Sequence, residues 1–598
     1  MLKKQKKLAR VSKPAIFISI MLVICTLIFC FLTLSSIPKI SISNVISQDI
    51  LNIANNYSSN LYDKSKNDND KIITKNDQQN TKQNNINNNS FDANDPSFNS
   101  IYKYADPRLV SNNLLSPLYD KQFPFIPADL DKANSVKEAF LHGYNSYKKY
   151  CWKSDELKPI SKKCKNTLNA GLTIVDSITT LYIMNLTEEY LEAREFIEKE
   201  FKPNGQWSLF EFIIRFVGAF ISIYQLSNDK LFLNKAVQCA DAIYPLFDKE
   251  NGFYTSKFTL TTDENGTMTA KQASMHISKR DINLAEVGTY QIEFLTLTAL
   301  TGDKKYMELA LKVYKRLWKD NPHKAILYSA LENQLEKNHK IRSSQIRHLG
   351  AGADSYFEYI IKSYILTNGV SPRILEQHMK IIQEMRDTLL FETKKLHLNG
   401  IGVLKGDSLS PYMEHLATFV PGMIAIGTVK NNNNKDDDLS LAKKMVDTIW
   451  FVMNSTLAKL MPEKVFFNIN NDSYIDKEFN IVLNEYFLRP ESVESIFYLY
   501  RFTGEQKYRD IAWDFFIGIN ESCRVKDGFA SVKGLNGKIK YVDIMDSWFL
   551  AETLNYLYLT FADTRLISPA EWVFNTESHP LHVWPKNISG KYKKSLLL

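Results

Sequence analysis

Long amphipathic stretches joined by short polar connectors fill the sequence from about residue 131 onward, and they constrain the fold more than any other feature. Apolar residues recur at three- and four-residue steps, as on one face of an α-helix, over 136–150, 209–225, 231–246, 286–300, 304–317 and 492–501. Strand-like alternation is scarce, with short hairpins suggested only at Gly252-Phe253-Tyr254, Gly402-Val403-Leu404 and Gly528-Phe529-Ala530. We therefore predict a large all-α domain built from repeated helix pairs.

The beginning of the chain predicts a membrane anchor. Residues 15–34 contain no charged side chain, and about 20 helical residues match the roughly 30 Å hydrocarbon core of a bilayer. This run exceeds the apolar region of a cleavable signal peptide, which is roughly 7–15 residues long. A basic cluster precedes it, made of Lys3, Lys4, Lys6, Lys7, Arg10 and Lys13. We predict a cytosolic tail at 1–14 and a transmembrane signal anchor at 15–34 in a single-pass type II membrane protein, with a cleaved signal as the alternative.

The segment between the anchor and the helical domain has a different composition. Residues 35–130 are rich in asparagine and poor in large apolar residues, so they cannot bury enough surface to offset the entropy lost on ordering. We predict a disordered, low-complexity stem, with an interaction tail as the alternative. The helical domain is then expected over 131–585 and a C-terminal tail over 586–598. Asn-x-Ser/Thr acceptors, such as Asn185 and Asn265, agree with exposure to a lumen.

Charge and cysteine content exclude several function classes. The formal net charge is +8, but the basic cluster before residue 14 accounts for most of it, which argues against nucleic acid as a partner. The chain has no Gly-rich phosphate loop and no Gly-x-Ser-x-Gly motif. Cysteine and histidine spacings do not match a zinc site. Cys151 and Cys164 are close enough in sequence for a local disulfide in an oxidising compartment.

Acidic residues recur where helices are expected to begin. Glu211 and Arg215 share one helical face among Phe and Ile residues; they either form an ion pair at the edge of the core or leave Glu211 desolvated, which would raise its pKa as a general acid requires. Asp354 follows Gly350-Ala351-Gly352-Ala353, where it fits a helix cap or first turn.

Two further segments combine acids with a helix start or an aromatic ring. Pro490 suits the first helical position, so Glu491 and Glu494 lie one turn apart and repel each other unless a cation, a proton or a hydroxylated ligand joins them. Trp548 and Glu552 place a ring beside an acid, either in a sugar-binding site or in the core. Two carboxylates flanking a glycosidic bond are the minimum for glycoside hydrolysis. Whether these acids meet depends on the fold.

Ordered motifs along the chain resemble glycoside hydrolase family 47, the class I α-1,2-mannosidases. They are Asp155-Glu156-Leu157-Lys158-Pro159, Thr173-Ile174-Val175-Asp176, Phe210-Glu211, Ile214-Arg215, Glu293-Phe294, Asp354-Ser355-Tyr356-Phe357-Glu358-Tyr359, Arg489-Pro490-Glu491, Ala551-Glu552-Thr553-Leu554 and Phe574-Asn575-Thr576-Glu577-Ser578-His579-Pro580. The resemblance implies an (α/α)7 barrel, a bound Ca²⁺ and inversion of the anomeric centre. It assigns Glu211 as general acid, Glu491 as general base and Asp354 as a third essential carboxylate for which the base role is the alternative.

The resemblance also implies binding roles. Thr576 is expected to hold Ca²⁺, and the expected sugar-contact or site-lining residues are Arg215, Glu293, His415, Arg489, Glu494, Trp548, Glu552 and Glu577. His415 taken by itself fits a satisfied, partly buried histidine better than a ligand. The chain departs from the family where Thr179-Thr180 stands in place of a second Asp, which is expected to affect packing or site support near Asp176.

Together these features predict an enzyme that trims α-1,2-linked mannose from high-mannose N-glycans on glycoproteins in the ER or Golgi. Gly352, two residues before Asp354, favours the broader Golgi type. One alternative is a degradation-enhancing mannosidase-like protein that binds glycans with weak or no hydrolysis. Another is a tethered lectin.

Overall fold

A computed structural model describes residues 109–110, 114–116, 123–254, 256–273, 281–332, 346–429, 435–469 and 477–598. These residues belong to one compact unit, which spans residues 94–598. The predicted anchor at 15–34 and nearly all of the predicted stem lie outside the described residues. Among the described residues, one helical stretch, Leu209–Ser227, is apolar and long enough to cross a bilayer, but 89% of its apolar 18-residue window is buried inside the domain. It is therefore a segment of the core.

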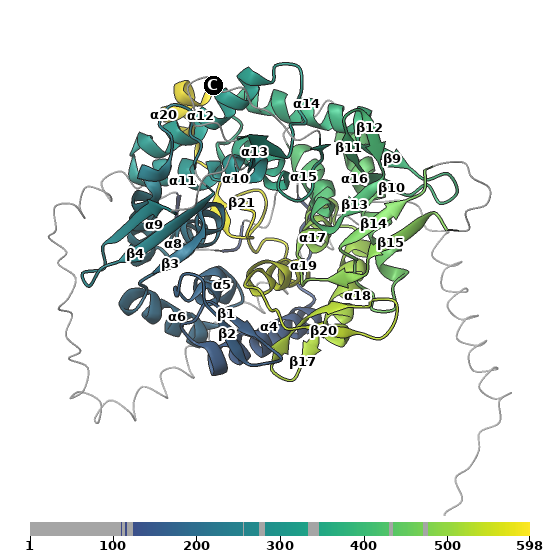
Figure 1. Cartoon of the computed structure of the whole chain (residues 1–598), viewed down its shortest axis with the longest axis horizontal. Helices are drawn as coiled ribbons and strands as arrows, with labels where there is room; N and C mark the ends of the chain where they lie inside the picture. Colours follow the sequence, from purple (N-terminus) through teal and green to yellow (C-terminus); the bar gives the residue numbers. More distant parts are fainter. Residues whose placement is uncertain are drawn as a thin grey trace, which may run out of the picture. The chain divides into compact units, whose positions relative to one another are not determined.

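An inner ring of helices forms the centre of the unit (Figure 1). Within the described residues it has seven members, which are α5 (Leu172–Ile183), α8 (Gly218–Ser227), α11 (Gln291–Thr301), α13 (Asp354–Leu366), α15 (Val420–Gly427), α17 (Glu491–Thr503) and α19 (Leu554–Phe561). Each helix contacts the next one in this order. The turn Phe549–Thr553, which leads into α19, packs on α5 and closes the ring.

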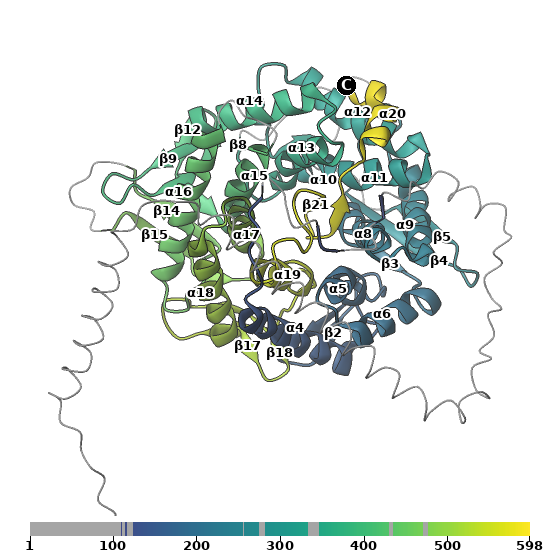
Figure 2. The same cartoon turned by 180° about the vertical axis from the view of Figure 1, so that it is seen from behind.

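An outer helix packs against each inner helix (Figures 1 and 2). The outer helices are α4 (Leu130–Cys151), α6 (Thr187–Lys199), α9 (Lys230–Ile243), α12 (Lys304–Asp320), α14 (Pro372–Thr388), α16 (Lys435–Asn454) and α18 (Gln506–Ser522). Inner helices are buried nearly all round, and every side chain of α11 is buried. Outer helices such as α12 have one buried stripe and one polar face, as expected for helices that cover a core. The predicted helix pairs are thus confirmed, and their arrangement is that of an (α/α)7 barrel.

Two of the predicted helices are interrupted near the barrel axis. The pattern over 286–300 forms α10 (Leu284–Gly288) and α11, separated at Thr289. A Cβ on Gly288 would lie 2.4 Å from the ring of Tyr356, so α13 approaches here more closely than a side chain would permit. The pattern over 209–225 forms α7 (Leu209–Phe212), a π-helical turn at Ile213–Val217 and α8. A second π-helical turn, Phe549–Thr553, precedes α19.

Short strands occupy the loops between the helices, so the body is mostly helical and not strictly all-α. The described residues contain β1 (Glu156–Lys158), β2 (Lys163–Lys165), β3 (Gly205–Ser208), β4 (Lys257–Thr262), β5 (Met268–Gln272), β6 (Asp281–Asn283), β7 (Ala330–Glu332), β8 (Ile346–Arg347), β9 (Leu390–Glu392), β10 (Asn399–Ile401), β11 (Val403–Lys405), β12 (Ser408–Ser410), β13 (Tyr412–Glu414), β14 (Lys464–Phe467), β15 (Phe479–Leu483), β16 (Glu485–Tyr486), β17 (Arg524–Val525), β18 (Gly528–Phe529), β19 (Ser531–Lys533), β20 (Lys540–Val542), β21 (Trp572–Phe574) and β22 (Pro580–His582). They form antiparallel sheets of two or three strands. The hairpins suggested at Gly402 and Gly528 are present as β11–β12 and β17–β18.

A disulfide and a last helix complete the unit. Cys151 at the end of α4 is bonded to Cys164 in β2, while Cys239 and Cys523 are buried free thiols. Residues 586–598, the expected tail, contain α20 (Lys586–Leu596), which buries Ile588 and Tyr592.

Candidate active site

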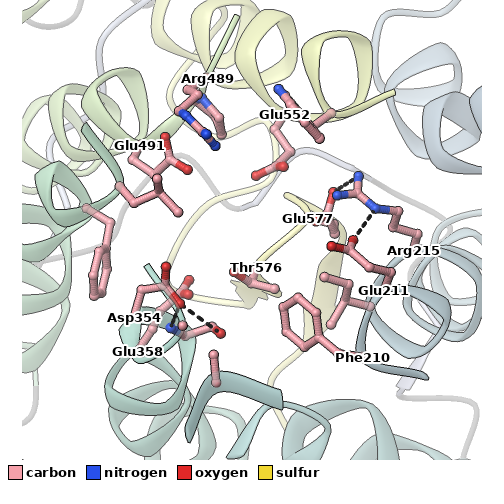
Figure 3. A pocket seen from close by; sticks show the side chains of 18 of the residues that line it. Phe210, Glu211, Arg215, Asp354, Glu358, Arg489, Glu491, Glu552, Thr576 and Glu577 are labelled. Atoms are coloured by element: carbon pink, nitrogen blue, oxygen red, sulfur yellow. Dashed lines mark hydrogen bonds and ion pairs between the residues drawn. The ribbon is translucent and has the colours of Figure 1, made fainter. Parts of the chain in front are cut away.

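A pocket of about 400 Å³ lies among the inner helices, and carboxylates dominate its wall (Figure 3). Its lining includes ten of the twelve predicted site residues, namely Glu211, Arg215, Asp354, Arg489, Glu491, Glu494, Trp548, Glu552, Thr576 and Glu577. They come from α7 and the π-helical turn after it, α13, α17, the turn before α19 and the β21–β22 connection. The fold therefore brings together acids that are separated by more than 350 residues in the sequence.

Two of the acids occupy equivalent places at the starts of inner helices. Asp354 is the first residue of α13 and Glu491 the first residue of α17, directly after Pro490, so the sequence prediction of two helix starts is confirmed. Burial raises the pKa of Asp354 and of Glu491 to about 7, and Arg489 opposes the shift at Glu491. Glu491 Oε2 is buried and has no hydrogen bond to a described residue. Both carboxyls can therefore gain or lose a proton near neutral pH.

Glu211 extends from the opposite side of the pocket (Figure 3). Ser208 caps the short helix α7 by accepting a hydrogen bond from the Glu211 backbone N–H at 3.4 Å. The Glu211 side chain is 31% exposed, and its Oε2 lies 2.8 Å from Arg215 Nε. Of the two alternatives for this pair, the structure shows the ion pair at the edge of the core. The short helix α7 brings this carboxylate to the edge of the core, where solvent reaches it.

Arg215 contacts three acids, of which Glu211 and Glu577 line the pocket (Figure 3). Its Nη1 lies 2.6 Å from Glu577 Oε2 and 3.0 Å from Asp176 Oδ2, in addition to the Nε contact with Glu211. Burial by itself would raise the pKa of Asp176, but Arg215 and His579 outweigh it and the pKa is lowered. Arginine suits this place because its planar fork donates in several fixed directions at once.

Trp548 lies close to two guanidinium groups. The central guanidinium carbon of Arg215 is 5.4 Å from the indole ring, and that of Arg489 is 6.0 Å from it. Arg489 also donates from Nε to Glu463 Oε2 at 2.7 Å. Cation–π contacts of this kind hold an aromatic ring in one orientation. The part of the ring that lines the pocket offers an apolar face to a sugar.

Thr576 lies at the base of the pocket, in the turn between β21 and β22 (Figure 3). The turn is held by Asn575, whose Oδ1 accepts from the backbone N–H groups of Glu577 and His579, each at 2.9 Å. The Thr576 N–H donates to Tyr359 Oη at 3.3 Å. Thr576 therefore has a defined position at the pocket floor.

Four glutamates surround this floor, namely Glu358, Glu494, Glu552 and Glu577. Burial raises the pKa of Glu494 to about 8, with Lys362 opposing the shift. Burial also raises the pKa of Glu552 and of Glu577 well above the usual range, and Glu577 adds to the shift at Glu552. A cluster of this kind attracts protons or a cation.

The donor set at the floor fits a hard cation bound largely through oxygen ligands that are not carboxylates. Within the described part of the chain, no three carboxylate, imidazole or thiol groups converge in a way that could hold a metal directly. Thr576 supplies a hydroxyl and a carbonyl oxygen, and the surrounding glutamates could orient water molecules. Such a shell of oxygens is the type that Ca²⁺ accepts.

Two predicted sugar-contact residues do not line the pocket. His415 is fully buried behind Glu491, with its Nε2 3.7 Å from Glu491 Oε2 and its Nδ1 3.2 Å from the carbonyl of Met461. Burial lowers its pKa to about 3, so the ring is neutral. Glu293 is also fully buried and accepts hydrogen bonds from Tyr359 Oη at 2.7 Å and from Asn575 Nδ2 at 3.0 Å. Both residues lie behind the lining of the pocket, and their predicted role in sugar binding stays a prediction.

Three neighbours of the pocket were not among the predicted site residues, although two of them, Glu358 and Asp176, stand in the family motifs. Glu358 lines the pocket, Lys362 lies behind it, and Asp176 anchors Arg215. A signal for two of them was present, because Asp354, Glu358 and Lys362 follow one another at four-residue steps on a single helical face. For Asp176 the sequence gave only the family motif and not its partner, because Arg215 is distant in the chain.

A helical barrel whose axial pocket carries carboxylates on opposite walls, together with an aromatic platform, has the equipment of a glycoside hydrolase. Comparison with known proteins agrees. Residues 139–583 match glycosyl hydrolase family 47. The mannosyl-oligosaccharide 1,2-alpha-mannosidase MNS1 of Arabidopsis thaliana is 36% identical over 489 residues, which cover 81% of this chain and 84% of that protein. The endoplasmic reticulum mannosyl-oligosaccharide 1,2-alpha-mannosidase of Mus musculus is 34% identical over 490 residues, which cover 81% and 72%.

A solved structure supports the same fold. The alpha-1,2-mannosidase from Trichoderma reesei matches with a TM-score of 0.69 and 23% sequence identity, over 77% of this chain and 100% of that chain. The chain belongs to glycosyl hydrolase family 47, and the resemblance read from its motifs is confirmed.

Proposed function

We propose that this protein is an inverting, Ca²⁺-dependent α-1,2-mannosidase that removes terminal mannose from high-mannose N-glycans. The observation that carries the proposal is that Glu211 and Glu491 project from opposite walls of one pocket, with Asp354 beside Glu491 (Figure 3). The related mannosyl-oligosaccharide 1,2-alpha-mannosidases support the substrate class.

Inversion requires a water on the face of the sugar opposite the leaving group. Glu491 takes a proton from this water as it attacks the anomeric carbon, and Asp354 is the alternative base. Glu211 delivers a proton to the glycosidic oxygen, directly or through a second water. The carbon–oxygen bond to the leaving sugar breaks as the new one forms. Arg215 keeps Glu211 at the pocket wall, since its Nε lies 2.8 Å from Oε2.

Thr576 is the residue proposed to hold Ca²⁺, through its hydroxyl and carbonyl oxygens. When bound, the ion supplies a fixed positive charge that binds sugar hydroxyls and orients the mannose ring. Glu358, Glu494 and Glu552 are placed to hold water molecules around this floor. Their negative charges also offset the positive charge of the ion.

The deciding experiment is incubation of the full-length protein with a Man9 oligosaccharide, with and without a calcium chelator. Stepwise loss of mannose that the chelator stops, and that Ca²⁺ restores, supports the proposal. NMR of the first product should show β-mannose before mutarotation, because the reaction inverts an α linkage. Release of α-mannose would contradict the inverting mechanism. Trimming that continues unchanged in the chelator would contradict the dependence on calcium.

A glycan-binding role in the degradation of misfolded glycoproteins, with weak or no hydrolysis, is the second candidate. One observation favours it: Arg215 donates a hydrogen bond to Glu211. This contact stabilises the ionised form of Glu211, whereas a general acid must be protonated. The same incubation separates the two functions, because such a protein would retain Man9 on an affinity column without shortening it. Retention of Glu211, Asp354, Glu491 and Thr576 in one pocket favours hydrolysis.

The cellular setting is part of the proposal. We infer a single-pass type II protein of the ER or Golgi membrane, with residues 15–34 as anchor, an Asn-rich stem and a lumenal barrel. The ER mannosidase of Mus musculus, a related protein, and the disulfide between Cys151 and Cys164 support a secretory location. Protease treatment of sealed microsomes should remove only the N-terminal tail. Digestion of the barrel in sealed vesicles would refute this orientation.

A further inference from the structure

A buried histidine three residues after Thr576 contacts one helix through both of its ring nitrogens. His579 Nδ1 lies 2.9 Å from Thr179 Oγ1, and His579 Nε2 lies 3.3 Å from Asp176 Oδ1. All three side chains are fully buried. Asp176 and Thr179 are one turn apart on α5, so the imidazole spans adjacent turns of that helix.

The partners restrict where the protons can be. Asp176 is ionised, because Arg215 and His579 outweigh the effect of burial and lower its pKa; an ionised carboxylate only accepts hydrogen bonds. His579 Nε2 and Asp176 Oδ1 lie 3.3 Å apart, within ion-pair distance, and neither atom has a hydrogen bond to any other described residue. The proton that faces the carboxylate is therefore the one on Nε2. In a neutral imidazole the other nitrogen, Nδ1, is then an acceptor. A hydroxyl can donate to it, whereas a carboxylate cannot.

The ring joins two parts of the pocket. On one side, the His579 backbone closes the turn that carries Thr576 and Glu577, because its N–H donates to Asn575 Oδ1 at 2.9 Å and its carbonyl accepts from the Asn575 N–H at 3.0 Å. On the other side, Asp176 Oδ2 lies 3.0 Å from Arg215 Nη1. The orientation of the ring therefore affects both the pocket floor and the arginine that holds Glu211.

We propose that Thr179 is a positioning residue: its hydroxyl donates to His579 Nδ1 and so keeps the ring proton on Nε2. This orients Asp176 and Arg215 and holds the Thr576 turn against α5. The inference about activity rests on the proposed mannosidase function, whereas the inference about the ring does not. Replacement of Thr179 by Val keeps the shape of the side chain but leaves Nδ1 buried without a donor. Loss of such a supporting contact typically lowers activity or metal affinity about 10- to 100-fold.

The test combines a spectroscopic and a kinetic measurement on the full-length protein. With ¹⁵N-labelled histidine, the His579 signals, assigned by their loss in His579→Gln, should show an Nδ1 without a proton and a protonated Nε2. Thr179→Val should change these signals and lower kcat about 10- to 100-fold with a smaller change in KM. Thr179→Ser, which keeps the donor, should restore both.

A neighbouring threonine supplies the control. Thr180 is also buried on α5, but its hydroxyl donates to the carbonyl of Ala551 at 3.2 Å, so Thr180→Val should leave the His579 spectrum unchanged. A protonated Nδ1 in the wild-type protein would overturn the inference, as would a Thr179→Val variant with wild-type spectrum and kcat. If the wild-type protein releases no mannose, the proposed function fails, and the spectrum alone still decides whether Thr179 sets the form of the ring.

Discussion

Arg215 and Glu577 are 362 residues apart in the sequence, yet Nη1 of the arginine lies 2.6 Å from Oε2 of the glutamate inside the barrel. The contact joins the π-helical turn after α7 to the turn between β21 and β22. It therefore connects the wall that holds the proposed acid with the floor that holds Thr576. Variants of Arg215 test how strongly the position of the acid depends on the pocket floor.

Arg215→Lys should lower mannose release about 100-fold, because one ammonium cannot reach Glu211, Asp176 and Glu577 together and the acid moves out of position. The measurement is kcat/KM with a Man9 substrate. Arg194→Lys is the matched control, since Arg194 also contacts two acids, Asp229 at 2.6 Å and Glu198 at 3.0 Å, but lies at the surface. Equal activity of the two variants would remove Arg215 from the mechanism.

Glu491→Gln should lower kcat by about 10²- to 10⁴-fold, the usual contribution of a general base. The amide has the same shape, so circular dichroism and the melting temperature should remain close to those of the wild type. Glu485→Gln serves as control, because Glu485 does not line the pocket. Its Oε1 lies 2.8 Å from Lys533 Nζ. Full activity of Glu491→Gln would leave Asp354 as the base.

Lys362→Met should destabilise the protein by about 3–5 kcal/mol, because it leaves the carboxylates of Glu358 and Glu494 buried without their cation. Urea denaturation measures the loss. Lys380→Met removes a comparable pair with Glu376, but both side chains are more than half exposed, so its cost should stay below about 0.5 kcal/mol. A similar cost for both variants would show that the buried lysine is not needed for charge balance.

Without calcium, stability should fall as the pH rises from about 4 to 8. Burial raises the pKa of Asp354 and of Glu491 to about 7 in the folded protein, whereas the unfolded carboxyls titrate near 4. The folded state thus binds more protons in this interval, and the stability present below pH 4 is lost as the pH passes through 7. Thermal unfolding in chelator measures this effect.

The Glu491→Gln variant isolates one part of this pH dependence. The melting temperature of the variant minus that of the wild type should be larger at pH 8 than at pH 5, because the amide cannot ionise. Added Ca²⁺ should stabilise the wild type more at pH 8 than at pH 5, since cation binding favours ionised carboxylates. The prediction would be contradicted if, in chelator, the wild type became more stable relative to the variant as the pH rises.

Removal of the Cys151–Cys164 disulfide by double alanine substitution should cost about 3 kcal/mol, as expected for a closed loop of this length, whose ends are separated by 13 residues. The loop also contains Asp155, whose carboxylate accepts from the N–H groups of Thr167 and Leu168 at 2.6 and 2.8 Å. A reductant should lower the melting temperature of the wild type and leave that of the variant unchanged. Equal sensitivity of both proteins would mean that the disulfide does not contribute to stability.

Local patterns predicted much of the architecture. The three- and four-residue apolar repeats predicted helices such as α4, α12 and α17. The Pro490-Glu491 pair predicted the start of α17 to within one residue, since Pro490 is the cap and Glu491 the first helical residue. The same patterns missed the break at Thr289 and both π-helical turns, because these arise from close packing against other helices. Arg215 and Glu552 lie in the π-helical turns, so the local geometry of two site residues depends on neighbours that are distant in the sequence.

The sequence by itself determined the helical class of the domain, its motifs and the kinds of side chain available for chemistry, because periodicity, helix caps and residue type are local properties. Only the tertiary structure decided which acids share a pocket, and it placed His415 and Glu293 behind the wall while bringing Glu358 to its surface. It also gave Thr179 a partner, since the contact with His579 spans 400 residues. Exposure, charge pairing and proton position depend on such long-range contacts, and these exist only once the ring of helices has closed.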